Sequence, residues 1–116
     1  MDAQFKLGVC YENGVGVTAD ARKAFKWYER AAEAGHAGAQ FELGSRYEDG
    51  NGVTADARKA FEWYERAAEA GNFLLGRCYE RGVGVAADAR AALVWYERAA
   101  AAGVTEAADR VRASLR

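Results

Sequence analysis

The sequence has 116 residues, of which 16 are basic and 17 acidic, and it contains 13 glycines, two cysteines and no proline. A net charge of −1 gives no electrostatic basis for binding nucleic acid or an anionic membrane, and we expect neither as a partner. No apolar run has the ~20 residues of a membrane-spanning helix, and the first residues lack the basic and then apolar order of a signal peptide, which favours a cytoplasmic protein. Because alanine, the best helix former, is abundant and proline, the worst, is absent, we expect a single all-α domain.

The chain contains three copies of one pattern. Residues 17–35 recur as residues 53–71 with a single change, Lys26 to Glu62. Gly8 recurs 36 residues later as Gly44, and then 32 residues later as Gly76, because the third copy lacks four residues before Gly76. A period of this length is typical of a solenoid, in which each unit buries its apolar face on its neighbour.

Each copy is predicted to form two helices joined by a glycine-rich turn. In the second copy the first helix covers residues 37–48, and the turn at 49–52 breaks it because glycine tolerates a positive φ. The second helix opens near Asp56, whose carboxylate can accept hydrogen bonds from the free amides of the first turn. Gly71 is expected to end this helix.

Small and aromatic residues recur at fixed positions within the helices. A glycine inside a helix costs about 0.5–1 kcal/mol relative to alanine, so the repetition of Gly8 as Gly44 and Gly76 predicts a close approach of the partner helix. We expect Ala24, Ala60 and Ala92 to be the opposing surfaces. We expect Trp27, Trp63 and Trp95 to be buried as wedges between units.

These observations divide the chain into three units and a cap. The predicted units are residues 1–36, 37–71 and 72–103, and the third should have a first helix about 6 Å shorter than the others. Residues 104–116 are predicted to form a last helix that caps the array, because the end of a solenoid needs a polar outer face.

The recurring residues resemble the Sel-one-like repeat (SLR), a longer-period relative of the tetratricopeptide repeat. In the first unit the resemblance rests on Ala3 to Tyr11, Gly14 to Val17, Asp20, Lys23-Ala24, Trp27-Tyr28 and Ala31 to Gly35. It implies an α/α superhelix whose first helices line a concave groove, and a role as an adaptor for protein complexes. The third unit departs from the pattern by its missing residues and by Ala91-Ala92 in place of Lys-Ala.

If the first helices line a groove, some of their residues are needed for packing between helices. The other residues of these helices form a candidate surface for a protein or peptide ligand. Three phenylalanines in register would form an apolar ladder, flanked by charges that differ between units, which suits an extended peptide or a helix with apolar anchors. The alternative is that the phenylalanines are themselves packing residues, since they also repeat. The candidate residues are Phe5, Val9, Glu12, Phe41, Ser45, Glu48, Phe73, Arg77, Glu80 and Arg81.

The sequence argues against catalysis and against a cofactor or metal. Gly14-Val15-Gly16 lacks the preceding strand, the third glycine and the Lys-Ser/Thr pair of a phosphate-binding loop. One histidine and two cysteines cannot supply a tetrahedral structural metal site. His36 precedes Ser45 by roughly 13 Å of helix, which is too far for a nucleophile and its base. We therefore expect a non-enzymatic protein.

Two alternatives to the adaptor function remain at this point. The near-identity of two units is consistent with a structural array that self-associates through its open N-terminal face. Cysteine-rich relatives of the repeat are associated with binding or weak hydrolysis of β-lactams, but they carry paired cysteines within each unit, which this sequence lacks.

Overall fold

The computed structural model describes the backbone of residues 2–114 and the side chains of residues 2–67 and 72–113. Within this part the chain forms helices and no strands, so the all-α prediction is confirmed. The helices are α1 (Asp2–Asn13), α2 (Ala21–Glu33), α3 (Ala37–Asp49), α4 (Ala57–Arg66), α5 (Ala68–Arg81), α6 (Ala89–Ala101) and α7 (Thr105–Ser114).

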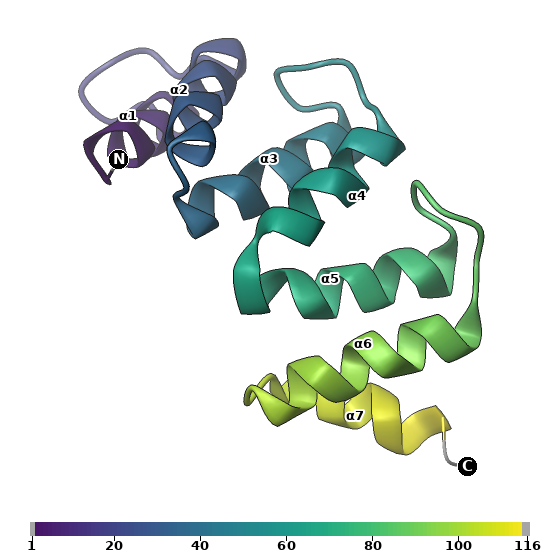
Figure 1. Cartoon of the computed structure of the whole chain (residues 1–116). Coiled ribbons are helices and arrows are strands. Elements are labelled where there is room, and N and C mark those ends of the chain that lie inside the picture. Colours follow the sequence, from purple (N-terminus) through teal and green to yellow (C-terminus); the bar gives the residue numbers. More distant parts are fainter. Residues whose placement is uncertain (1, 115–116) are drawn as a thin grey trace.

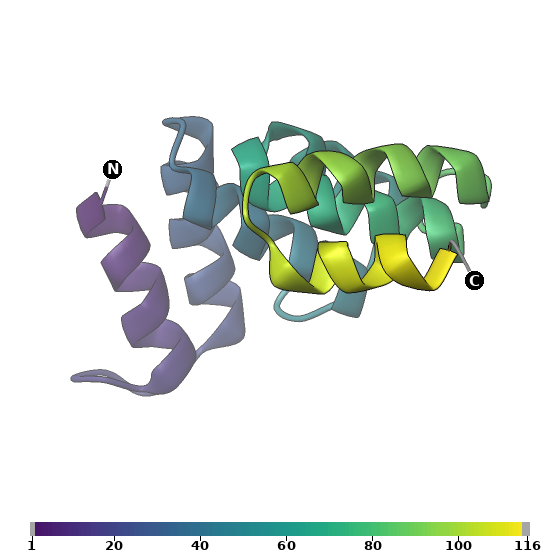
Figure 2. The same ribbon diagram turned by 90° about the horizontal axis from the view of Figure 1, so that it is seen from below.

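Each helix packs against the helix that follows it, which produces an elongated stack measuring 49 × 27 × 22 Å. Figure 1 shows the helices in chain order, from α1 at one end to α7 at the other. Viewed from below, α7 lies beside α6 at the end of the stack opposite α1 (Figure 2). The solenoid prediction is therefore confirmed.

The second helix of every unit begins at an aspartate, as the repeat predicts. The side chains of Asp20, Asp56 and Asp88 accept hydrogen bonds from backbone amides of the first turn at about the same distance, for example 3.1 Å from Lys59 N to Asp56. The first helices α3 and α5 end at Gly50 and Gly82, which take φ values of 70° and 74° in the left-handed region.

The four missing residues shorten α4 and leave α5 at full length. α4 has 10 residues, compared with 13 in α2 and in α6, whereas α5 has 14. The predictions of a shortened first helix in the third unit and of Gly71 as a helix end are therefore wrong. α5 keeps its length because Leu74, Leu75 and Cys78 on it are buried in the core, so the break moves back to Ala67 and residues 68–71 become the first turn of α5.

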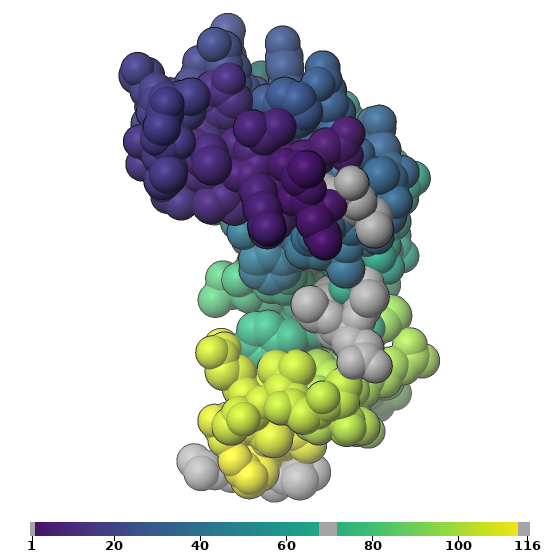
Figure 3. Space-filling view, turned by 90° about the vertical axis from the view of Figure 1, so that its left-hand side faces the viewer, coloured from purple at the N-terminus to yellow at the C-terminus, as the bar shows by residue number. Residues whose placement is uncertain are grey.

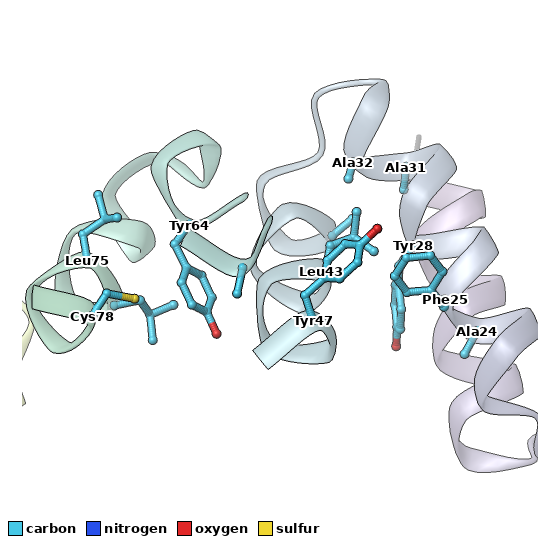
Figure 4. Close-up of a cluster of buried hydrophobic side chains, with 13 residues drawn as sticks. Ala24, Phe25, Tyr28, Ala31, Ala32, Leu43, Tyr47, Tyr64, Leu75 and Cys78 are labelled. Carbon is cyan, nitrogen blue, oxygen red and sulfur yellow. The ribbon is translucent and has the colours of Figure 1, made fainter. Parts of the chain in front are cut away.

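The core is a row of side chains that runs from one unit to the next (Figure 4). Its largest fully buried members are Tyr28, Leu43, Tyr64 and Cys78. A second cluster, around Tyr96 and Ala99, joins α6 to the terminal helix α7 through Ala107. The apolar core thus runs along the array as two clusters, and the half-buried Phe73 packs against both.

Glycine is required inside the first helices because a tyrosine ring lies directly against it. A Cβ atom on Gly8 would come within 2.7 Å of the Tyr28 ring, and one on Gly76 within 2.7 Å of the Tyr96 ring. Gly44 faces Tyr64 in the same way. The predicted close approach is confirmed, but the opposing surface is the tyrosine of the second helix and not the alanine expected from the sequence.

The tryptophans do not act as buried wedges. Trp27, Trp63 and Trp95 are half-buried, and each ring is covered on its outer side by an arginine three residues later, with the guanidinium carbon 4.6–4.7 Å from the ring centre. The next residue in each helix is the buried tyrosine. A rotation of about 100° per residue separates the two positions, so only one of them can point into the core.

Candidate binding groove

A pocket lies where α3, α5 and the start of α7 come together. Its volume is about 520 Å³, and its lining residues are Phe41, Phe73, Leu74, Arg77, Val104, Thr105 and Glu106. Figure 3 views the molecule from the side on which these helices begin, with the first unit at one end and the last helices at the other. Phe41, Phe73 and Arg77 are the predicted groove residues that the fold brings together here.

Residues 104–106 were not among the predicted groove residues. They belong to the segment predicted as a cap, and its role in lining the pocket follows from its packing beside α5 and α6. No sequence signal marked them, because the cap lacks the residues that repeat in the three units.

Each phenylalanine of the predicted ladder packs one side of its ring on a buried tyrosine. The ring centres are 5.5 Å apart for Phe5 and Tyr28, 6.5 Å for Phe41 and Tyr64, and 5.5 Å for Phe73 and Tyr96. All three phenylalanines are half-buried. They are therefore packing residues that also present apolar surface.

Phe5 is covered on its other side by His36. The two rings stack with their centres 4.5 Å apart and their planes 16° from parallel. His36 caps α3, since its Nδ1 accepts a hydrogen bond of 3.1 Å from Ala39 N, and its Nε2 lies 3.2 Å from a carboxylate oxygen of Asp2. Phe5 therefore does not contribute to the pocket that Phe41 and Phe73 share.

The predicted groove glutamates have partners within the chain. The hydroxyl groups of Tyr28, Tyr64 and Tyr96 donate hydrogen bonds of 2.7, 2.7 and 2.9 Å to Glu12, Glu48 and Glu80, respectively. Each glutamate also pairs with an arginine from the next helix pair along the array. We call this arrangement the Tyr–Glu–Arg bridge.

The three bridges take their arginines from different positions. Glu12 pairs with Arg46 of α3, Glu48 with Arg77 of α5 at 2.7 Å, and Glu80 with Arg110 of α7 at 2.9 Å. The arginine side chains are 5%, 25% and 43% exposed, respectively. The bridges therefore tie successive units together, most tightly at the junction between the first two units.

Arg46 is the most enclosed charge in the described part of the chain. Its guanidinium lies over the Tyr28 ring, 5.2 Å from the ring centre, and also pairs with Glu42 at 3.3 Å. Burial by itself would raise the pKa of Glu12, but hydrogen bonds from Tyr28 and Arg46 hold that pKa below its usual value. Burial raises the pKa of Glu42.

The bridges predict an alkaline loss of stability. Burial and the neighbouring glutamate raise the pKa of Tyr96 to about 12, and the same causes raise the pKa values of Tyr28 and Tyr64 further. In the unfolded chain these hydroxyls lose their protons near about pH 10, so the folded state binds more protons above that pH. Their contribution to stability should be complete below about pH 10 and should decline as the pH rises through the folded pKa values.

Denaturant unfolding followed by circular dichroism between about pH 8 and pH 12 measures this decline. Tyr64→Phe removes one of the three titrating groups, so the variant should show a shallower decline than the unmodified chain. An identical slope in the two proteins would contradict the assignment.

The remaining predicted groove residues lie outside the pocket. Val9 packs half-buried against the core cluster, Ser45 is half-buried and Arg81 is exposed. Cys10 and Cys78 are both free thiols. Among the described residues, no group of three or more histidine, cysteine and acidic side chains could hold a metal ion, and no helix has the length and apolar character needed to cross a membrane.

The family model of the Sel1 repeat matches three consecutive segments, residues 2–36, 37–72 and 71–104. The chain belongs to the Sel1-repeat family. The matched segments contain α1 to α6, and α7 follows the last of them. Sel1 repeats typically serve as protein-interaction modules.

Solved structures of Sel1-repeat proteins share this fold. The chain is 37% identical to a Sel1 repeat protein from Oxalobacter formigenes, with a TM-score of 0.88, and the match covers 95% of this chain and 47% of that one. It is 36% identical to a protective antigen of uropathogenic Escherichia coli strains that displays an SLR fold, with a TM-score of 0.90 and coverage of 95% and 24%. The chain thus spans about half the length of the first protein and about a quarter of the second.

A third Sel1-like neighbour is the Helicobacter pylori cysteine rich protein B. It is 25% identical, with a TM-score of 0.75, and the match covers 93% of this chain and 89% of that one. No curated protein matches the sequence significantly.

Proposed function

We propose that this Sel1-repeat chain is a non-enzymatic interaction module that binds a peptide or helix of a partner protein along its first helices. The observation that carries the proposal is the pocket between Phe41, Phe73 and Val104, whose apolar walls come from two successive units and from the residue just before α7. A pocket of about 520 Å³ is large enough to receive an apolar side chain of a partner, which is how helices and extended peptides are anchored in grooves.

The charges around the pocket indicate what it selects. Among the described lining residues, Arg77 is the one cation, and its guanidinium pairs with Glu48 at 2.7 Å. Glu106 adds a negative charge to the same wall. A phosphate or carboxylate ligand would therefore compete with Glu48 for the one cation among the described lining residues, whereas an apolar anchor would be buried between the two rings. The proposed ligand is a segment with an exposed leucine- or phenylalanine-like anchor.

Truncation of the two phenylalanines is expected to abolish binding. The double variant Phe41→Ala/Phe73→Ala removes both rings from the pocket. The loss of each anchor contact costs about 2 kcal/mol, or roughly 30-fold in affinity, and the two losses together should prevent capture of the partner. The measurement is affinity capture from lysate with mass spectrometry, followed by titration of the captured partner against purified chain. Circular dichroism verifies that the double variant remains helical.

Phe61→Ala is the matched control. Phe61 is also half-buried, but it packs on Tyr79 with ring centres 5.6 Å apart and does not line the pocket. Phe61→Ala should unfold at a lower denaturant concentration but should capture the partner as well as the unmodified chain does. Equal capture by the unmodified chain and the Phe41/Phe73 double variant would contradict the proposed binding site.

A further inference from the structure

The two interfaces between successive units repeat the same contacts. Phe25 of α2 packs edge-on against Tyr47 of α3, with ring centres 5.3 Å apart at 90°, and Phe61 of α4 does the same with Tyr79 of α5, at 5.6 Å and 87°. The turn after each first helix lies against the start of the preceding second helix. A Cβ atom on Gly52 would collide with the carbonyl of Ala21, and one on Gly84 with the carbonyl of Ala57.

Each interface therefore has two complementary sides. The first-helix side contributes a tyrosine and a glycine of the following turn. The second-helix side contributes a large apolar residue and the alanine at the start of the helix. These contacts define the surface that one unit offers to the next.

α1 presents a complete first-helix side that no described residue covers. Tyr11 stands in the register of Tyr47 and Tyr79 but has no aromatic partner among the described residues, and Gly16, in the register of Gly52, has open space around it. Leu7 is 40% exposed, whereas its counterparts Leu43 and Leu75 are 0% and 2% exposed. Val15 and Val17 of the following turn are also exposed.

α6, at the other end, carries the second-helix side. Ala89 and Leu93 stand in the registers of Ala21 and Phe25. The helix that packs on α6 is α7, which imitates a first helix: Ala107 is fully buried like Ala39, and Arg110 pairs with Glu80 as Arg46 pairs with Glu12.

The described part of α7 fills this side incompletely. A pocket of about 110 Å³ remains over α6, lined by Ala89, Ala92, Leu93 and Tyr96 together with Glu80 and Arg110. It lies at the positions that Tyr47 and the turn at Gly52 occupy in the internal interface. In the sequence the register of Tyr47 falls on Leu115, which lies outside the described residues.

We propose that the 116-residue chain self-associates head to tail, with α1 of one copy docking on α6 of the next copy in the place of α7. Tyr11 and the turn at Gly16 would then meet Leu93 and Ala89, which continues the internal interface from one copy into the next. Lys6, which stands in the register of Arg110, supplies the cation for Glu80. The assembly does not rest on the proposed binding function, but displacement of α7 would move Thr105 and Glu106 away from the binding pocket.

α7 and the incoming α1 occupy the same place on α6, so they compete. α7 belongs to the same chain and competes at an effective concentration of the order of millimolar, which keeps the unmodified chain mainly monomeric at low concentration. An interface between unlike faces leaves one face of each kind free at the two ends of a dimer, so further copies can add to it. Release of α7 should therefore convert the monomer into chains of increasing length.

The test releases α7 without removing it. Ala107→Glu places a charge at a fully buried position of α7, and sedimentation velocity over a concentration series is expected to show dimers and larger species where the unmodified chain is monomeric. Leu7→Glu in the same background should restore the monomer, because it places a charge on the docking side of α1. Val94→Glu, at an exposed apolar residue of α6, is the matched control and should not restore it.

Cys10 provides a local readout of the same event. It is half-buried, whereas burial raises the pKa of Cys78 to about 11 and makes that thiol a poor nucleophile. The rate of Cys10 modification by a thiol reagent should fall at least severalfold as Ala107→Glu associates, and it should stay constant when Leu7→Glu is also present.

The proposal is overturned if Ala107→Glu is helical by circular dichroism and yet monomeric at every concentration, or if it associates equally with and without Leu7→Glu. Should Ala107→Glu lose its helicity, the unmodified chain at high concentration decides the question. Association that Leu7→Glu removes supports head-to-tail docking, and the absence of such association, or association that Leu7→Glu leaves unchanged, excludes it.

Discussion

Replacing Tyr64 with alanine is expected to lower the free energy of unfolding by about 3–5 kcal/mol, the range for truncating a large buried aromatic side chain. Tyr64 is fully enclosed between α3 and α5, its ring covers Gly44, and its hydroxyl donates a 2.7 Å hydrogen bond to Glu48. The substitution leaves a cavity in the larger of the two core clusters and removes one arm of a Tyr–Glu–Arg bridge.

The neighbouring residue provides the matched control. Trp63→Ala removes a larger side chain, but Trp63 is half-buried and its ring is covered by the exposed side chain of Arg66. The decrease in the free energy of unfolding should be clearly smaller for Trp63→Ala than for Tyr64→Ala. Urea unfolding monitored by circular dichroism gives both values, and an equal or larger effect for Trp63→Ala would contradict the assignment of the tyrosine as the buried residue between units.

Arg46→Met should lower the free energy of unfolding by about 2–3 kcal/mol. Breaking a fully buried ion pair typically costs about 3–5 kcal/mol, and the smaller value applies here because the carboxylates of Glu12 and Glu42 remain in contact with solvent. Methionine is chosen because it keeps much of the volume of the arginine stem, so the measured loss reflects the charge and its hydrogen bonds.

The same change at the last bridge should have little effect. Arg110 and Glu80 are both more than one-third exposed, and an ion pair at the surface is worth about 0–1 kcal/mol. Arg110→Met is therefore the control for Arg46→Met. The loss in the free energy of unfolding for Arg77→Met should lie between the losses for these two variants. Three equal losses in urea unfolding would mean that burial does not set the strength of the bridges.

The bridges also determine which parts of the candidate groove are open to a partner. The glutamates that sequence reasoning assigned to ligand binding are held by tyrosine and arginine, so they contribute to the cohesion of the array. The pocket between Phe41 and Phe73 is what remains for a ligand. A partner of this chain would therefore be recognised mainly by apolar contact.

The sequence by itself determined the repeating unit and the local structure within it. The recurrence of Gly8 as Gly44 and Gly76 sets the period, and the aspartates that precede each second helix set where those helices begin. These features depend on residues close together in the chain, such as a carboxylate and the amides two or three positions later, so local chemistry is sufficient to predict them.

Only the tertiary structure decided which repeating residue is buried and how the units are joined. Trp63 and Tyr64 recur with the same period, so periodicity cannot distinguish them; the rotation of the helix against its neighbours places the tyrosine inside. The arginines of the bridges stand at three different positions relative to the repeat, and the four missing residues are absorbed in α4. Each of these outcomes depends on contacts between helices distant in the chain, whose relative rotation and offset are set by packing of the whole array and not by any one unit.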